Sequence, residues 1–549
     1  MKDVILTEKY RQLDRDLALL SYRLDSTEQY ESRWFVADDE NIADARAELA
    51  ALNERIRALD APDAVYAAVK HHFLDFTESL GFVIDGLEED PLTAFFGFQE
   101  TLHNYIRLDK RPAAERLHLI LERLQQFQWN RDFLPELLKA RRDEKALADE
   151  AAGLLRTAAA MREESESVKE YFPEFSDMQA AILSDALYSF GQECEDIAGA
   201  ICPPEESGEK ASDDLDAVEK LPDGKYEELL RRRLGVELAE LLSWYEPEME
   251  KTRAEVFAIA AKACKDEAVP ETMEQVNELL FRHQPPAASA DEMYERARGY
   301  LKRTRAVAHE YVNLPEDEEC VCVTLPKFLK DSYPWGGYEG GDFRKRPYIG
   351  QMFLNQYNVP NISDGWIKMN SMHEAYPGHH VQYVRAAVDP TPETVKIGAK
   401  LVPLLEGTCL RTERAFEDTF PEDPYYPLFV AYRRHHTSVR IFVDLQLFYF
   451  GATVGEAVDI YRRELGLDFV TARAQVQAHQ NSPGYFTCYY YGMKKITDWE
   501  RELGFTKKDF TELCFSAGYV SIETFGMLVR MTEEERRRYC TEFKSLLRE

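Results

Sequence analysis

The sequence predicts a mainly α-helical protein built from two lobes, with a small antiparallel β-sheet in the second lobe. Apolar residues recur at three- and four-residue spacing along most of the chain, which is typical of amphipathic helices. A polar, acidic stretch without that periodicity interrupts them at residues 202–225. Since 549 residues exceed what one hydrophobic core usually supports, we expect a helical lobe over 1–201, an acidic linker or loop over 202–225, and a second helical lobe over 226–549 that carries the chemistry.

The helical pattern can be followed segment by segment. Residues 43–61 and 113–134 repeat apolar side chains at helical spacing, and residues 146–172 form a long, Ala-rich helix candidate. The pattern resumes at residue 226, continues to about residue 312, and returns from about residue 366 to the end. No fixed-period repeat is visible, so a solenoid is not predicted.

Two short segments between these helices look like β-strands. Residues 320–328 carry alternating β-branched side chains, and residues 348–359 follow a Gly-rich turn. The strand at 350–356 has two interpretations: as an edge strand it could bind an extended peptide through main-chain hydrogen bonds, or it could simply cap the helical body.

The charge and cysteine content narrow the class of partner. Asp and Glu outnumber Lys and Arg by 99 to 67, a formal charge of −32 that disfavours nucleic acid and anionic membranes as partners. The nine cysteines are odd in number and lack zinc-site spacing, so we expect free thiols in a cytoplasmic protein. The N-terminus shows no apolar signal core and no run of about 18 apolar residues exists. The oligomeric state stays open, with a homodimer as one option.

The most informative stretch is "NSMHEAYPGHHVQYV", residues 370–384. Zinc proteases with H-E-x-x-H place two imidazoles one helical turn apart, with a Glu beside the first. Here His373 and Glu374 begin that pattern, but Pro377 occupies the position of the second His. The next imidazoles belong to His379 and His380.

A continuous helix would not bring these imidazoles together. His379 would lie about 9 Å further along than His373 and about 120° round, and His380 about 10.5 Å further along. Pro377 cannot donate a helical hydrogen bond, and Gly378 relaxes the steric limits on the backbone. A break at this step could therefore return one of the two later imidazoles to the first.

A third metal ligand is expected from an acidic side chain downstream. Glu406 and Glu413 are seven residues apart and so share a helix face. One of them could bind metal while the other orients a ligand His. Two His and a carboxylate favour zinc, although cobalt or manganese can occupy such sites.

This pattern resembles a known family. "HEAYPGHHVQ", residues 373–382, followed by Glu406, Gly407 and Glu413, is similar to the signature of the bacterial domain-of-unknown-function 885 family. That family is similar in fold to the carboxypeptidase Taq-type zinc metallocarboxypeptidases, which are gluzincins. The resemblance implies a large helical metallopeptidase-like fold with a deep cleft.

The resemblance also implies roles for single residues. His373, His379 and Glu406 would be the metal ligands, and Glu374 the general base. His379 is preferred to His380 because Gly-His ends the carboxypeptidase motif. His380 would then be a neighbour that contacts substrate or supports the metal ligands from behind.

A later segment, "SPGYFTCYYYGMKK", resembles the family's P-G-x-x-x-x-Y-x-x-G pattern, with Tyr489 and Gly492 at the matching positions. A Tyr hydroxyl facing the metal could stabilise an oxyanion. Tyr490 or Tyr491 could take this role instead, and all three could be packing residues. The chain departs from the family at the preceding Arg-Tyr pair, where His479 stands in place of Tyr and could still donate a hydrogen bond.

The segment "YRRHHTSVR" places Arg433, His436 and Arg440 close together. A carboxypeptidase needs cations for the C-terminal carboxylate of its substrate, and Arg binds carboxylates in a bidentate manner. The alternative is a helix face neutralised by nearby acids, with Arg440 and Asp444 paired at i,i+4.

Together these residues predict a zinc-dependent peptidase, specifically a metallocarboxypeptidase acting on peptide substrates, in which Glu374 accepts a proton from the attacking water and passes it to the leaving amine. The alternatives are a metal-dependent hydrolase of another amide, or a catalytically inactive scaffold of the same fold.

Overall fold

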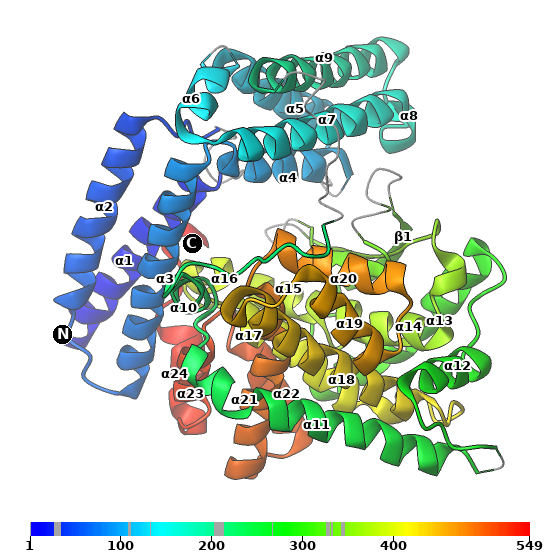
Figure 1. Ribbon diagram of the computed structural model, residues 1–549. Helices are drawn as coiled ribbons and strands as arrows, with labels where there is room; N and C mark the ends of the chain where they lie inside the picture. Colours follow the sequence, from blue (N-terminus) through cyan, green and yellow to red (C-terminus); the bar gives the residue numbers. More distant parts are fainter. Residues whose placement is uncertain are drawn as a thin grey trace. The chain divides into compact units, whose positions relative to one another are not determined.

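The computed structural model describes residues 2–26, 34–107, 111–131, 133–202, 214–265, 267–325, 330, 333–341 and 346–548 (Figure 1). They form two compact units. The first comprises Met1–Asp60, Phe76–Ala211 and Ser545–Glu549, and the second Ala61–Asp75 and Ser212–Lys544. Residues 203–213 of the predicted acidic linker lie outside the described residues, so its role stays a prediction.

The first unit is helical, as the periodicity predicts. Its core contains a cluster of aromatic rings from Trp34, Phe95, Phe98, Phe127 and Phe190, with Trp34 stacked on Phe127 at 5.3 Å between centroids. Its elements are α1 (Lys2–Leu24), α2 (Asp39–Arg57), most of α3 (Ala64–Glu89), α4 (Thr93–Arg107), α5 (Ala113–Asn130), α6 (Leu134–Arg141), α7 (Glu144–Glu166), α8 (Val168–Tyr171), α9 (Asp177–Ile201) and η9 (Leu546–Arg548).

The second unit is also mainly helical and contains the described strands. The start of α3 belongs to it. Its other elements are α10 (Lys225–Leu229), η2 (Leu230–Leu234), α11 (Leu238–Ala263), α12 (Met273–His283), α13 (Ala290–Tyr311), β1 (Glu318–Thr324), β2 (Gly336–Glu339), β3 (Tyr348–Leu354), η4 (Val359–Asn361), α14 (Asp364–Asn370), η5 (Ser371–Ala375), α15 (His379–Val388), α16 (Glu393–Ile397), α17 (Val402–Ala415), η6 (Glu417–Thr419), α18 (Tyr426–Leu445), η7 (Gln446–Phe450), α19 (Val454–Leu465), α20 (Phe469–Asn481), η8 (Tyr485–Thr487), α21 (Cys488–Leu503), α22 (Lys507–Ser516), α23 (Ile522–Leu528) and α24 (Glu533–Glu542).

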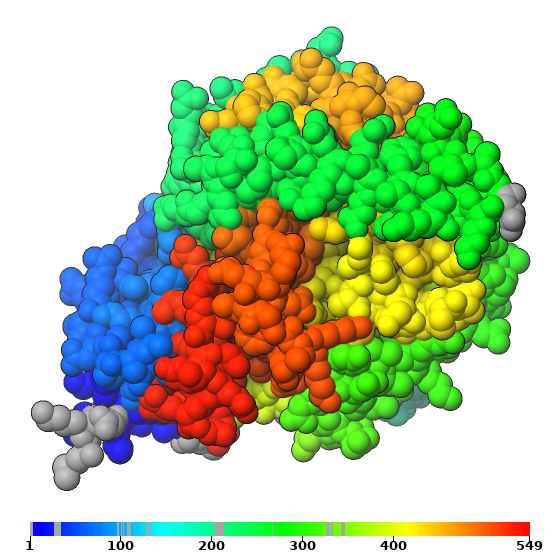
Figure 2. Space-filling view, turned by 90° about the horizontal axis from the view of Figure 1, so that it is seen from below, coloured from blue at the N-terminus to red at the C-terminus, as the bar shows by residue number. Residues whose placement is uncertain are grey.

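Local signals explain where many of these helices begin. The side chains of Ser176, Thr453 and Thr532 each cap the helix that follows and take part in a reciprocal capping box, which satisfies backbone donors that the first turn leaves free. In Figure 2, α21–α24 (orange to red) form part of the surface of the second unit, together with its green and yellow segments. No helix within the described ranges is both long and apolar enough for a transmembrane segment.

The sheet corrects two predictions. Its order is β1-β3-β2, and the two predicted strands, β1 and β3, pair in parallel instead of antiparallel. The long connection over 325–347 lets the chain return in the same direction, and it contains the unpredicted strand β2, which pairs antiparallel to β3. Residues 326–328 of the first predicted strand lie outside the described residues.

The second correction concerns the free edge. Because β3 is the central strand, residues 351–354 have paired neighbours on both sides, and the prediction of a peptide-binding edge there is wrong. The antiparallel edge strand is β2. Its two glycines have no side chains, so the sequence shows no alternation of apolar and polar residues there. A Cβ at Gly337 would lie 2.7 Å from the Phe353 ring, so only glycine fits this close approach.

The sheet anchors the His-Glu motif. Met293 and Ala297 of α13 share one buried core with Met352 of β3, Ala375 of η5 and Val381 of α15. The motif is therefore held against a packed wall of helix and sheet, which is the kind of support that a site of fixed geometry needs.

Candidate metal centre

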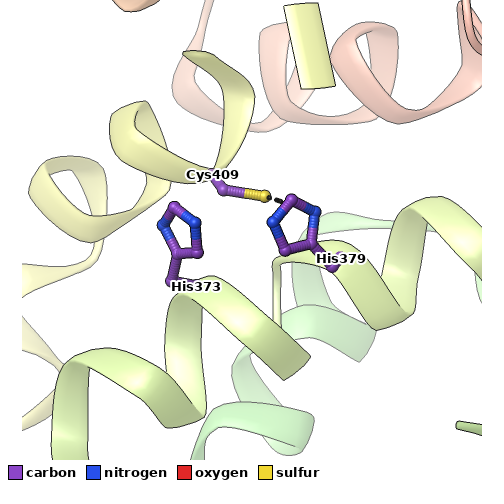
Figure 3. Close-up of side chains that lie close together, drawn as sticks. All are labelled: His373, His379 and Cys409. Atoms are coloured by element: carbon purple, nitrogen blue, oxygen red, sulfur yellow. Dashed lines mark hydrogen bonds between the residues drawn. The ribbon is translucent and has the colours of Figure 1, made fainter. Parts of the chain in front are cut away.

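The His-Glu motif lies on an interrupted helix, as the sequence predicts. A wide turn, η5, ends at Ala375, and α15 begins at His379. The backbone between them folds back so closely that a Cβ at Gly378 would lie 1.9 Å from the carbonyl oxygen of His373. The fold-back places the two imidazole rings 5.0 Å apart and nearly perpendicular, at 83° (Figure 3).

Glu406 of α17 completes a three-residue convergence. Its Oε2 atom lies 3.2 Å from Nε2 of His373 and 3.5 Å from Nε2 of His379. Ligands about 2.1 Å from a tetrahedral zinc are separated by about 3.4 Å from one another. The two measured distances thus fit ligands around one ion.

Hydrogen bonds on the far side of each ring fix which nitrogen faces Glu406. The amide nitrogen of Gln382 donates to the carbonyl of Leu405 (2.9 Å), so its oxygen must face Nδ1 of His379, at 2.9 Å. Nδ1 of His373 lies 2.7 Å from Oε1 of Glu413. Both Nδ1 atoms therefore carry the proton, which leaves the Nε2 lone pairs for a metal.

Cys409 offers a second donor set. His373, His379 and Cys409 each supply one ligand atom within 4.8 Å of the others, a group that could hold a metal ion (Figure 3). The Cys409 sulfur lies 3.6 Å from Nδ1 of His379, the nitrogen already bonded to Gln382. Using Cys409 through that nitrogen would break this bond, whereas using Glu406 preserves it. The sequence analysis passed over Cys409, although it follows Glu406 by three residues on one helix.

The electrostatics of the cluster favour a bound positive charge. Burial alone would raise the pKa of Glu406, but the neighbouring imidazoles of His379 and His373 bring it well below its usual range. Burial alone would lower the pKa of His373, but hydrogen bonds to Glu406 and Glu413 raise it to about 10. In the protein without metal, the proton that His373 keeps therefore supplies positive charge at the place where a metal cation can bind.

Two further glycines explain how α17 and α21 approach the centre. A Cβ at Gly407 would lie 2.5 Å from backbone atoms of Gly492 and Met493, and one at Gly492 would lie 1.7 Å from the carbonyl oxygen of Pro403. The backbones of the two helices are therefore in contact. This contact brings the tyrosines of η8 and of the start of α21 towards Glu406.

Of these tyrosines, the structure places an unpredicted one nearest the centre. Tyr485 directs its hydroxyl to Oε1 of Glu406 at 3.4 Å, and the hydroxyl of Tyr489 lies 3.4 Å from that of Tyr485. Both are half-buried. Tyr490 and Tyr491 instead hydrogen-bond glutamates of α11, so they tie two helices together. Pro-Gly immediately before Tyr485 was the signal that sequence reading could have used.

Glu374 and His380 differ in burial and in hydrogen bonding. Glu374 is half-buried and makes no hydrogen bond or ion pair with any residue that the structure describes. His380 is fully buried, with Nε2 2.8 Å from Oε2 of Glu318 and Nδ1 3.1 Å from the hydroxyl of Tyr338. The ring of His380 has no exposed surface and bonds Glu318 and Tyr338 of the sheet, and its predicted role at the substrate or behind the metal ligands stays a prediction.

The predicted cationic cluster is only partly neutralised. Arg433 and Arg440 are 6% and 8% exposed, and both lie over the ring of Tyr489, at 6.0 and 5.4 Å. The nearest acid to Arg433 is Glu413, at 4.0 Å. His436 bonds Gln475 at 3.2 Å, and burial, helped by the two guanidinium groups, keeps its pKa well below the usual value. His436 is thus a neutral residue beside two cations.

Asp444 does not pair with Arg440, so that prediction is wrong. Its carboxylate accepts hydrogen bonds from the Tyr226 hydroxyl (2.5 Å), from Nδ1 of His479 (2.7 Å) and from the backbone of Gly484 (3.0 Å). The remaining nitrogen of His479 accepts from a Tyr hydroxyl of α19 at 2.7 Å. His479 is 1% exposed, so it positions the loop before Tyr485 and has no access to substrate.

Comparison with known proteins places the chain in a family. The family model described as "Bacterial protein of unknown function (DUF885)" matches residues 25–526. The chain belongs to the DUF885 family. A search of curated proteins finds no significant match for this DUF885 protein.

Two solved structures share the fold of this DUF885 protein over nearly its whole length. One is a "putative lipoprotein" from Colwellia psychrerythraea, with a TM-score of 0.72 and 17% identity, covering 98% of this chain and 99% of that chain. The other is a "putative lipoprotein of unknown function" from Shewanella oneidensis, with a TM-score of 0.66 and 14% identity, covering 96% and 100%. At these identities the likeness concerns the fold alone.

Proposed function

We propose that this DUF885 protein is a metal-dependent peptidase of the carboxypeptidase type. One observation carries the proposal: Nε2 of His373 and Nε2 of His379 both approach Oε2 of Glu406, while each Nδ1 is held by a hydrogen-bond acceptor. A disused site has no physical reason to keep both the ligands and the groups that orient them. The donor chemistry favours zinc, with cobalt or manganese as substitutes.

The metal would lower the pKa of a water molecule and polarise the substrate carbonyl. Glu374 follows His373 directly and has no partner among the described residues, so its carboxylate can accept the proton of the attacking water and deliver it to the leaving nitrogen. The hydroxyls of Tyr485 and Tyr489 can donate to the carbonyl oxygen as negative charge develops on it.

The choice of carboxypeptidase rests on Arg433 and Arg440. Both guanidinium groups are buried beside Tyr489 without a carboxylate closer than 4.0 Å among the described residues. Burying a charge without a close partner costs free energy on the order of several kcal/mol. A bound carboxylate would therefore stabilise this arrangement. The free C-terminal carboxylate of a peptide is the group that a carboxypeptidase must recognise.

The test combines metal content with a conservative variant. Purified protein should contain one metal ion per chain, and its activity on N-blocked dipeptides should be lost on chelation and restored by zinc. Glu374→Gln should keep the ion and lower kcat by about 10²–10⁴-fold, as loss of a general base does. Absence of stoichiometric metal, together with unchanged activity in Glu374→Gln, would overturn the proposal.

The cellular location of the protein can be tested in the bacterium that produces it. The sequence predicts a cytoplasmic protein, whereas the two structural relatives are described as lipoproteins. Cell fractionation with an antibody to the native protein decides between the two: recovery without detergent supports the cytoplasm, and release only by detergent supports the envelope.

A further inference from the structure

The centre contains a third arginine that the proposed peptidase reaction does not use. Arg233 of η2 is half-buried, and its guanidinium group lies 5.8 Å from the ring centroid of Tyr485, the residue that hydrogen-bonds Glu406. Among the described residues Arg233 has no ion pair and no side-chain hydrogen bond. Its neighbour Arg232, in contrast, bonds Glu228 at 3.3 Å.

The three arginines surround one pair of rings. Arg233 lies over Tyr485, and Arg440 and Arg433 lie over Tyr489. The two tyrosines are themselves in contact, with ring centroids 5.9 Å apart and hydroxyl oxygens 3.4 Å apart. The three guanidinium groups therefore lie against one pair of tyrosines, and one of these tyrosines directs its hydroxyl to Glu406.

This concentration of positive charge contrasts with the charge of the protein as a whole. The protein as a whole carries a formal charge of −32, and other arginines of the same unit lie against carboxylates. Arg434, one residue from Arg433, bonds Glu255 at 3.0 Å, and Arg411 is bonded to Glu500. Here Arg433 has only Glu413, at 4.0 Å, and Arg233 and Arg440 have no ion pair among the described residues, so the local field attracts anions.

The number of cations bears on the substrate. Arg433 and Arg440 share Tyr489 and suffice for one terminal carboxylate, which one guanidinium group can bind in a bidentate manner. Arg233 lies against the other tyrosine, Tyr485, and remains available for a second anion. A peptide whose last residue is Asp or Glu carries two carboxylates a few bonds apart. Its α-carboxylate can bind Arg433 and Arg440, and its side-chain carboxylate can bind Arg233.

We propose that the site prefers substrates ending in an acidic residue, with Arg440 and Arg433 binding the α-carboxylate and Arg233 the side-chain carboxylate. This inference rests on the proposed peptidase function for its activity assay, but its binding assay does not require catalysis. Arg233 acts here as a specificity-determining residue.

The binding test compares N-acetylglutamate with N-acetylglutamine by calorimetry on the full, metal-loaded protein. The two ligands have the same shape and differ by one charge. We expect N-acetylglutamate to bind at least about tenfold more tightly, since a hydrogen bond to a charged group contributes about 1.5–3 kcal/mol. Arg233→Gln should remove the difference while leaving N-acetylglutamine binding unchanged. Arg231→Gln, at an exposed arginine two residues earlier, is the matched control and should preserve it.

The activity test compares kcat/KM for N-blocked dipeptides ending in Glu and in Gln. A preference for Glu of about tenfold or more that disappears in Arg233→Gln supports the inference. Cleavage of both substrates at equal rates, with no effect of Arg233→Gln, overturns it but leaves the peptidase function intact. Cleavage of neither substrate, with equal binding of the two acetylated amino acids, overturns both.

Discussion

The identity of the metal ligands can be tested through one amide side chain. Gln382 is buried, accepts a hydrogen bond from Nδ1 of His379 at 2.9 Å, and donates one to the Leu405 carbonyl at 2.9 Å. Gln382→Met has a similar shape and removes both bonds. Gln382→Glu removes the bond to Leu405 but keeps an acceptor for Nδ1 and adds negative charge.

The two variants should move metal affinity in different directions. Loss of the outer hydrogen bond to a ligand imidazole typically weakens metal binding by about 10–100-fold, or about 1.4–2.7 kcal/mol. The bond to His379 is a neutral one, worth about 0.5–1.5 kcal/mol, so we expect Gln382→Met to weaken binding by about tenfold. Gln382→Glu should bind at least as tightly as the wild type, because a carboxylate raises the basicity of the imidazole.

The assay is competition for zinc with a chromophoric chelator at fixed pH, after removal of bound metal by dialysis. Gln356→Met is a matched control, since its amide also bonds a backbone donor and acceptor, at Leu325, and lies in the turn that follows β3. It should lower the melting temperature without changing the dissociation constant for zinc. Tighter binding by Gln382→Met would refute the argument, because it would mean that Nδ1 of His379, freed from the amide, joins Cys409 as a ligand.

Three further outcomes follow from other contacts. Gly378→Ala should abolish stoichiometric zinc binding, because the new Cβ would lie 1.9 Å from a backbone oxygen, while Gly299→Ala, with nothing within 4 Å, should bind normally; metal analysis after gel filtration checks both. Tyr485→Phe should lower kcat more than Tyr489→Phe, since only the former hydroxyl contacts a ligand carboxylate; equal effects would contradict this order. Burial alone would raise the pKa of Asp75, but its hydrogen bonds and ion pair lower it to about 2, so Asp75→Asn should cost about 2 kcal/mol in urea unfolding at pH 7. That stability is present above the unfolded pKa of about 3.9 and is lost as the pH falls towards 2, so the difference should shrink to about half near pH 3; a constant difference would contradict the assignment.

Local pattern was sufficient for the helices and for the ligand candidates. The apolar spacing predicted α2, α5 and α7, and the Pro-Gly break predicted that an interrupted helix could bring His379 to His373, which the ring distance of 5.0 Å now shows. The sheet was beyond local pattern. Strand order depends on contacts between distant segments, and β2 is too short and too rich in glycine to show alternation.

The same limit applies to the residues around the centre. Gln382 was visible only as the last letter of a motif, and its role depends on a carbonyl of another helix. Arg233 lies far from the motif in sequence and reaches the centre only because η2 packs beside the Pro-Gly loop, where a Cβ at Gly484 would lie 3.1 Å from Leu230. Spacing along one chain cannot report such contacts.

The glycines of the centre connect these observations. Gly378, Gly407 and Gly492 each stand where a Cβ would come within 2.5 Å of backbone atoms. The first brings the second imidazole back to the first, and the other two press α17 against α21, so that the carboxylate of Glu406 and the hydroxyl of Tyr485 meet. Each ligand therefore depends on a backbone approach that any larger residue would widen, and a shift of about 1 Å is enough to impair a catalytic arrangement. A variant that relaxes one of these approaches should lose metal affinity even though it changes no ligand.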